Sequence, residues 1–246
     1  RELTPPEQVP EDIECLERIS DGLGARALPK SAEEVTLKLF SRRPFILSEI
    51  LRTLTNFSLN VISEVSMPVS LPGGRKGHVD CFEIQAAAPA VATLVADTNR
   101  LVDALRRIEE GRSTDGPLNS LVLDGGLTAR EVEILRCLRN HLLQLRTHYN
   151  VETVNETFLR NLAATTSILR LFIARFDPAL GDRDQRKAAV DAASGEVQAA
   201  LEAIKSLIDD EILRGLSGLV NAALRTNAFQ RPERAVISIK FESKSI

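Results

Sequence analysis

The spacing of apolar residues changes part-way along the chain, and this change constrains the fold more than any other feature. Between residues 34 and 86, three segments carry apolar side chains at every second position, which is the period of a half-buried strand. From residue 128 nearly to the end, apolar residues recur every three or four positions, which is the period of a helix. The pattern predicts a mixed α/β unit followed by a helical unit.

Within the mixed unit, strands and helices alternate. The strand-like segments are 34–40, 59–71 and 78–86, and the helical ones are 43–57 and 91–108. In the second strand, the residues expected on one face are Leu59, Val61, Val65, Met67, Val69 and Leu71. The order βαββα is that of an incomplete ferredoxin-like domain, whose full form ends in a further strand. That closing strand is not evident, because residues 109–119 read as a linker.

The expected fold class is therefore α+β, with four segments along the chain. They are an N-terminal helix and loop segment (1–30), the ferredoxin-like domain (31–112), a helical domain (113–232) and a terminal strand (233–246). A helix break is expected at Ser206 to Asp209. The terminal strand has no partner after it, so we interpret it as the first strand of a further domain. The absence of an initial Met suggests a piece of a longer protein.

Composition argues against several classes of protein. A net charge of −3 is a poor match to a dedicated nucleic-acid binder, which carries a basic excess. No apolar run reaches the roughly 20 residues that span a bilayer, and the acidic, Pro-rich start is unlike a signal peptide. Three scattered cysteines predict no disulfide framework. We expect a cytoplasmic protein without membrane or nucleic-acid partners.

One phrase, "LTAREVEILRCL" (Leu127–Leu138), resembles the opening of the helix-turn-helix output domains of response regulators. A recognition helix must follow a tight turn closely, so that its first residues reach base edges. Here the apolar spacing continues through "RNHLLQLRTHY" without a Gly. A transcription regulator therefore remains only as a weak alternative.

Other local patterns do not indicate chemistry. "GLGARA" (Gly22–Ala27) has the letters of a dinucleotide fingerprint, but a helical pattern precedes it and Pro29 follows, so we read it as a helix end and loop. His78 and Cys81 stand three apart on a strand and point to opposite faces, which excludes a shared metal there. No catalytic triad or carboxylate pair has local support, so no catalytic, cofactor or metal residues are expected.

Arg42 and Arg43, between the first strand and its helix, are the best candidates for binding. A strand-to-helix loop offers free amides and a helix dipole to a carboxylate, and an arginine adds a bidentate grip. Together with Asn56 they form the predicted effector-binding set. Two solvated charges without a role are the plain alternative.

Several longer phrases resemble one family, the large bacterial NAD-specific glutamate dehydrogenases. The phrases are "LSEILRTLTNFSLNVISE" (Leu47–Glu64), "LNSLVLDGGLTAREVEILR" (Leu118–Arg136), "LFIARFDP" (Leu171–Pro178) and "DDEILRGLSGLVNAALRTNAFQ" (Asp209–Gln230). They occur in the family's order across roughly residues 35–230, and the first lies in the family's ACT-like segment. Residues 138–158 depart from the family pattern, which leaves any interface role of that segment open.

The resemblance implies a parent enzyme that oxidatively deaminates L-glutamate with NAD. The family's catalytic lysines and nucleotide-binding glycines lie downstream, so this segment alone is expected to be non-catalytic and without a cofactor. Its work would be regulation and assembly, through an ACT-like domain and a helical domain. The expected partners are a downstream dehydrogenase domain, further copies of the chain and an amino-acid effector. A stand-alone amino-acid-sensing ACT-like scaffold is the alternative.

Overall fold

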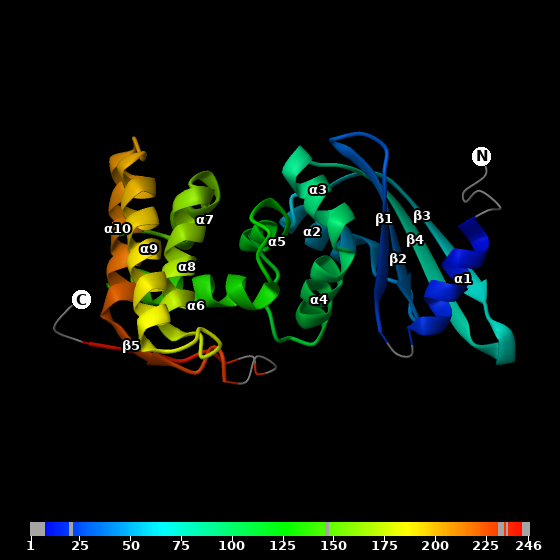
Figure 1. Cartoon of the computed structure of the whole chain (residues 1–246). Helices are drawn as coiled ribbons and strands as arrows, with labels where there is room; N and C mark the ends of the chain where they lie inside the picture. Colours follow the sequence, from blue (N-terminus) through cyan, green and yellow to red (C-terminus); the bar gives the residue numbers. More distant parts are fainter. Residues whose placement is uncertain (1–7, 20–21, 146–147, 231–233, 235, 243–246) are drawn as a thin grey trace. The chain divides into compact units, whose positions relative to one another are not determined.

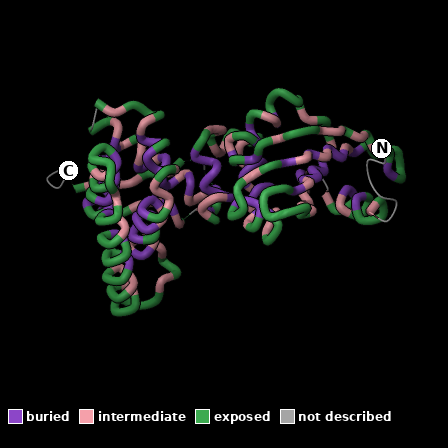
Figure 2. The backbone as a smooth tube through the Cα atoms, turned by 90° about the horizontal axis from the view of Figure 1, so that it is seen from above, coloured by how far each residue is buried: buried purple, intermediate pink, exposed green. Residues whose placement is uncertain are grey.

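The computed structural model describes residues 8–19, 22–145, 148–230, 234 and 236–242. The chain divides into two compact units, Arg1–Ala129 and Arg130–Ile246, each with its own buried core (Figures 1 and 2). The expected α+β class is confirmed: the first unit contains a four-stranded antiparallel sheet, and the second is mainly helical.

The elements of the first unit follow one another closely along the chain. They are α1 (Val9–Arg18), β1 (Gly24–Pro29), β2 (Glu34–Ser41), α2 (Leu47–Asn56), β3 (Asn60–Ser70), β4 (Lys76–Gln85), α3 (Ala88–Ala96), α4 (Thr98–Glu109) and the short α5 (Leu121–Asp124). Helices α2, α3 and α4 cover one face of the sheet, where Val35, Leu37 and Leu39 of β2 are fully buried. Helix α1 covers part of the other face, where Leu16 packs on Phe40.

The first strand, β1, corrects the reading of residues 1–30 as helix and loop. Residues 24–29, which include most of "GLGARA", pair antiparallel with β2, and the sheet order is β1-β2-β4-β3. In a complete βαββαβ domain, the strand beside the first strand of the repeat is the closing one. Here β1 takes that edge position from the N-terminal side. The missing strand therefore precedes the repeat, and the fold is a circular permutation of the expected one.

Strand β3 differs from its prediction in the direction of its side chains. A bulge between Val61 and Ser63 shifts the register with β4. Val61 consequently lies opposite Ile84, on the face covered by α2 to α4, whereas Met67 lies opposite Val79 on the α1 face. One extra residue exchanges the two faces of a strand, so the single apolar face expected for residues 59–71 was wrong.

The second predicted helix is divided at Asp97. Its backbone leaves the helical conformation there (φ −152°, ψ 87°), and its side chain accepts a hydrogen bond from the Asn99 amide at 3.1 Å. A short polar side chain that caps the following turn is a common helix start. The single apolar stripe predicted for 91–108 thus comes from two consecutive helices, α3 and α4.

The predicted linker is fastened to the first unit. The Asp115 carboxylate accepts hydrogen bonds from Thr53 Oγ1 at 2.9 Å and Asn56 Nδ2 at 2.8 Å, both on α2. Leu118 and Leu121 are buried behind it. The compact unit accordingly runs to Ala129, beyond the boundary expected at residue 112.

The second unit consists of five helices and a short ribbon in its described residues. They are α6 (Ala129–Leu145, which starts at the unit boundary), α7 (Val151–Arg160), α8 (Leu162–Phe176), α9 (Arg183–Glu202), α10 (Leu207–Ala222), β5 (Ala223–Thr226) and β6 (Ile239–Phe241). The core contains Phe158, Ile168 and Phe172, all fully buried. Helix α6 continues without a break past Leu138, so the tight turn of a helix-turn-helix is absent at that place in the described structure.

The ends of the helices in this unit are well capped. Asp182 and Gln185 form a reciprocal capping box at the start of α9. Arg186 donates to the carbonyls of Ala174 and Arg175 in the last turn of α8, which would otherwise lack partners. As the sequence predicted, a helix break occurs at Ser206, whose hydroxyl accepts from the Asp209 amide.

The terminal strand pairs with a strand that precedes it in the described chain, and its interpretation as the first strand of a further domain stays a prediction. Strand β6 pairs antiparallel with β5, which follows α10 directly. On its other side, the Phe241 ring stacks on His141 of α6, with ring centroids 4.3 Å apart. The helical pattern of the sequence did not indicate β5, because this strand follows α10 directly.

Candidate functional site

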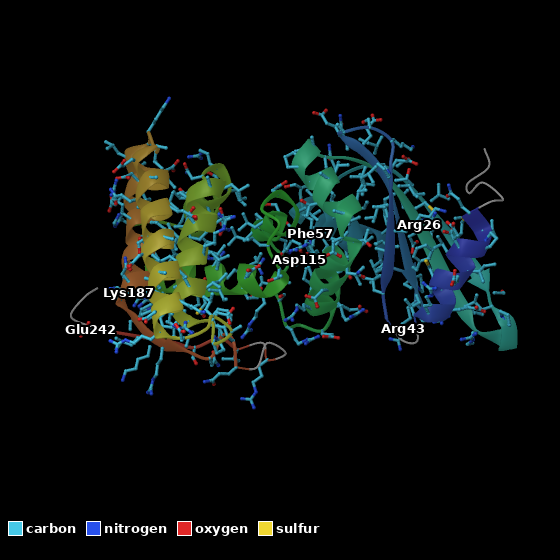
Figure 3. All side chains as sticks on the ribbon, viewed as in Figure 1. Arg26, Arg43, Phe57, Asp115, Lys187 and Glu242 are labelled. Carbon is cyan, nitrogen blue, oxygen red and sulfur yellow. The ribbon has the colours of Figure 1, made fainter. Side chains whose placement is uncertain are left out.

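The two arginines of the predicted effector set lie in the loop from β2 to α2, but their side chains differ. Arg42 donates two hydrogen bonds, from Nε at 3.0 Å and Nη2 at 2.6 Å, to the Ile19 carbonyl at the end of α1. Its Nη1 is buried and has no hydrogen-bond partner in the described part of the chain. Arg43 is exposed (Figure 3).

Two adjoining hollows open beside this loop. Their volumes are about 300 Å³ and about 370 Å³, and both are lined by Leu23, Arg43, Pro44, Phe45 and Glu109. The first continues along α2 and α4, where its wall adds the side chains Ile46, Glu49, Ile50, Thr53, Leu105 and Ile108. The second includes Arg42. A cationic group, two carboxylates and an apolar floor therefore surround a space of small-ligand size.

The start of α2 adds a further attraction for an anion. Its N-cap residue is Ile46, and no side chain caps the helix there. Free amides at a helix N-terminus carry partial positive charge and bind carboxylates or phosphates. Ile46 and Leu47 are also 62% and 48% exposed, which is unusual for large aliphatic residues.

Asn56, the third predicted residue, lies at the other end of α2. Its amide is already hydrogen-bonded to Asp115, and it does not line either hollow. The structure thus brings Arg42 and Arg43 together and leaves Asn56 with the linker. The sequence pattern did not indicate Leu23 or Glu109, because β1 and the end of α4 reach the loop only through the tertiary fold.

Burial disfavours the thiolate form of the three cysteines. Burial raises the pKa of Cys81 to about 11 and also raises the pKa values of Cys15 and Cys137. All three are free thiols. In the described residues, no group of three His, Cys, Asp or Glu side chains is placed to hold a metal ion.

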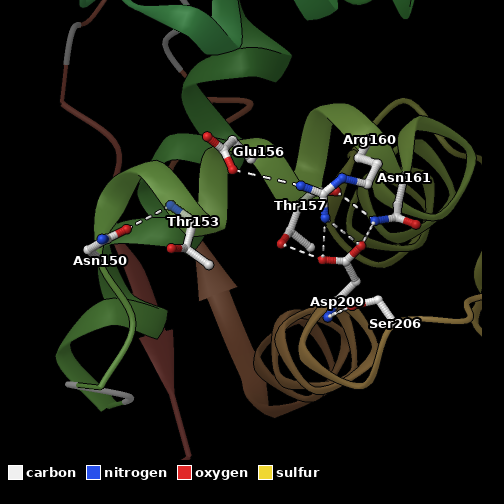
Figure 4. A network of polar contacts seen from close by, with 8 residues as sticks. All are labelled: Asn150, Thr153, Glu156, Thr157, Arg160, Asn161, Ser206 and Asp209. Atoms are coloured by element: carbon white, nitrogen blue, oxygen red, sulfur yellow. Dashed lines mark hydrogen bonds and ion pairs between the residues drawn. The ribbon is translucent and has the colours of Figure 1, made fainter.

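A second polar constellation lies within the helical unit, around Asp209 in the first turn of α10 (Figure 4). Its carboxylate accepts from Thr157 Oγ1 at 3.0 Å, Asn161 Nδ2 at 3.0 Å and Arg160 Nη1 at 3.1 Å. Desolvation alone would raise the pKa of Asp209, but these hydrogen bonds and the Arg160 charge outweigh it and lower the pKa. The arrangement fixes the joint between α7 and α8 against α10, which is a structural role.

Comparison with known proteins connects both units to one family. Residues 25–97 match the family model for the ACT3 domain of glutamate dehydrogenase, and residues 113–178 match its helical motif 3. Residues 196–246 match the catalytic domain of bacterial NAD-glutamate dehydrogenase. These matches are those of a region of NAD-specific glutamate dehydrogenase. The first match spans the four-stranded sheet from β1 onward, and the last begins inside α9.

Curated relatives agree with this assignment. An NAD-specific glutamate dehydrogenase of Mycobacterium tuberculosis is 31% identical over 211 residues, which cover 81% of the chain. Those of Halomonas elongata and Pseudomonas aeruginosa are 29% and 26% identical and cover 85% and 89% of it. The chain spans only 13% to 14% of the length of these relatives. Neither a DNA-binding regulator nor a stand-alone scaffold is favoured by these matches.

No helix in the described residues has both the length and the apolar composition to cross a membrane.

Proposed function

We propose that this chain is the regulatory and assembly region of an enzyme that converts L-glutamate, NAD and water to 2-oxoglutarate, ammonium and NADH in the cytoplasm. The family matches, which run in order through an ACT domain, a helical motif and a catalytic domain, carry this proposal. We expect the catalytic residues and the residues that bind the nicotinamide and the glutamate substrate to lie in the remainder of the enzyme. Within the chain, the second, helical unit holds the dehydrogenase domain in place. The first unit, which contains the ACT3 match and is called the ACT-like unit below, senses an effector.

The test of the parent activity uses the complete protein that contains this segment. L-glutamate and NAD are expected to give NADH, followed by its absorbance, and the 246-residue chain alone is expected to give none. A complete protein that forms no NADH with glutamate, although folded, overturns the proposal. Fractionation of cells that produce the complete protein tests the cytoplasmic location.

The effector that best fits the hollows beside α2 is a free amino acid. Arg43 and the open start of α2 face its carboxylate, whereas Glu49 and Glu109 supply negative charge for its ammonium group. Phe45, Leu105 and other apolar side chains of the wall suit an aliphatic or aromatic side chain. Both charged ends of a zwitterion thus find complementary groups within a space of suitable size.

Calorimetric titration of the chain with a panel of amino acids tests this site. At least one is expected to bind, and Arg43→Gln should weaken it about tenfold, since a charge-assisted bidentate bond is lost. Arg75→Gln, which removes an equally exposed arginine at the tip of the β3–β4 hairpin, is the matched control and should leave binding unchanged. Absence of heat with every amino acid leaves the unit with a role in assembly only.

The ACT-like unit also offers an edge for self-association. Strand β3 is an edge strand: among the described strands it pairs only with β4, so its other side is open. Its residue Ile62 is 65% exposed. A second copy that adds its own β3 would extend the sheet, so we expect a homo-oligomer. Light scattering after size-exclusion chromatography should show a mass above that of one chain, and a monomer at all concentrations would contradict this.

A further inference from the structure

The β5–β6 ribbon of the helical unit presents two cations directly opposite each other. The register pairs Arg225 with Lys240, and directly paired residues on antiparallel strands share one face of the sheet. Like charges in this position destabilise a ribbon unless something compensates them. Both residues are exposed, and the ion pairs found among the described residues include neither of them.

The other arginines around this ribbon have a different role. Arg130 donates to the carbonyls of Ala228 and Arg234, and Arg175 donates to those of Asn221 and Ala223. These guanidinium groups hold the ends of the ribbon in place. Arg225 and Lys240, in contrast, line an open hollow of about 420 Å³.

The wall of this hollow contains donors and no carboxylate among the described residues. Besides the two cations, its lining consists of Thr226, Asn227, Gln230, Ser238 and Ile239. The hollow is held in shape by side-chain bonds across the ribbon: Thr226 Oγ1 donates to the Ser238 carbonyl at 2.9 Å, and Asn227 Oδ1 accepts from the Ser238 amide at 2.8 Å. The volume falls within the range of small-molecule sites.

The geometry points to an oxyanion site at this ribbon that takes a phosphate-bearing small molecule. A phosphate monoester carries close to two negative charges at neutral pH and therefore compensates both cations, whereas one carboxylate compensates a single cation. Arg225 supplies a bidentate fork and Lys240 a compact point charge, a combination suited to phosphate oxygens. This site is separate from the proposed amino-acid hollow of the first unit and does not depend on it.

The test titrates the 246-residue chain with inorganic phosphate, pyrophosphate and NAD at constant ionic strength, with acetate as the carboxylate comparison. Saturable binding of at least one phosphate compound is expected, together with an increase of the melting temperature of the chain. Arg225→Gln and Lys240→Gln should each weaken that binding, and the double variant should weaken it at least about tenfold. Lys187→Gln, which removes an exposed cation from α9 of the same unit, is the matched control (Figure 3) and should change affinity less than about twofold.

The three compounds distinguish the source of the phosphate. Binding of pyrophosphate or NAD that is tighter than binding of inorganic phosphate assigns the site to a diphosphate ligand, and equal binding assigns it to a single phosphate group. Melting curves without ligand verify that the two ribbon variants fold, and they should be no less stable than the wild type, since a repulsion is removed. The proposal is overturned if no phosphate compound binds, if acetate binds as tightly, or if the double variant binds like the wild type.

Discussion

Removal of the Asp209 carboxylate should weaken the helical unit strongly, although Asp209 is a single residue in the first turn of α10. Its side chain is 5% exposed, and Thr157, which donates to it, is 1% exposed. In Asp209→Ala, the buried Thr157 hydroxyl loses its acceptor inside the protein, at about 1 to 3 kcal/mol, whereas the half-buried Asn161 amide keeps the Thr157 carbonyl as an acceptor and loses less. Arg160 is 59% exposed, so its ion pair adds only about 0 to 1 kcal/mol.

We expect the free energy of unfolding to fall by about 3 kcal/mol for Asp209→Ala. Relaxation of the neighbouring side chains recovers some of the energy of the lost hydrogen bonds and ion pair. Asp209→Asn keeps the shape and one acceptor, and should lose about 2 kcal/mol. The neighbouring Asp210, which pairs with Arg214 on the same helix, provides the control, and Asp210→Asn should stay within about 0.5 kcal/mol of the wild type. Urea denaturation followed by circular dichroism measures these differences, and hydrogen exchange of α7, α8 and α10 assigns them to this unit.

The pH dependence offers a second measurement of the same carboxylate. Because the pKa of Asp209 is lowered in the folded state, its contribution to stability is complete above the unfolded pKa of about 3.9 and is lost as the pH falls through the folded pKa. The difference between wild type and Asp209→Asn should therefore narrow below about pH 4. The reasoning fails if Asp209→Ala loses less than about 1 kcal/mol, or if Asp210→Asn is equally damaging.

Three further outcomes follow from buried groups of the ACT-like unit. Asp12→Ala removes the carboxylate that lies 2.6 Å from the amine of Lys38, a residue that is 2% exposed. Urea denaturation should show that the free energy of unfolding falls by about 3 to 5 kcal/mol, because a buried charge loses its partner. A decrease below about 1 kcal/mol would count against this. Cys81, with a pKa of about 11, should react slowly with a disulfide reagent at pH 8 in the folded chain and rapidly in urea, and rapid labelling without urea would contradict its burial. Burial raises the pKa of Asp124 in the folded state, so its ionised form reduces stability at neutral pH, and this penalty disappears as the pH falls through the folded pKa. Asp124→Asn should therefore leave the melting temperature at pH 7 unchanged or higher. A clear decrease of the melting temperature would refute the reasoning.

The sequence pattern predicted those elements whose own residues determine their burial. The apolar stripe of α2 is buried through Ile50 and Leu54, and the alternation in β2 and β4 places Leu37 and Phe82 in the core. Strand β1 escaped prediction because it is a half-exposed edge strand without an alternating apolar pattern of β-branched residues, and its conformation comes from pairing with β2. The local sequence of β1 does not show that β2 pairs with it in the folded chain.

In the candidate site too, the sequence predicted the residues of one local loop and missed those that the tertiary fold brings to it. Arg42 and Arg43 were found because a strand and a helix that are adjacent in the sequence define their loop. Glu109 and Leu23 were not found, because the tertiary fold alone brings α4 and β1 to that loop. Asn56 shares a helix with the loop but stands at its far end, and sequence proximity gave no measure of that separation.

The position of β1 at the edge of the sheet has a consequence for how the protein is made. In a βαββαβ domain, the sheet lacks one of its edge strands until the last strand leaves the ribosome. Here all four strands precede residue 86, and only α3, α4 and α5 of this unit remain to be synthesised. The ACT-like unit can therefore complete its hydrogen-bonded sheet before any helix of the second unit is synthesised, and domains generally fold in this order during translation. Loss of β1 would leave β2 as an unpaired sheet edge beside a buried core, so β1 protects this unit from edge-to-edge aggregation.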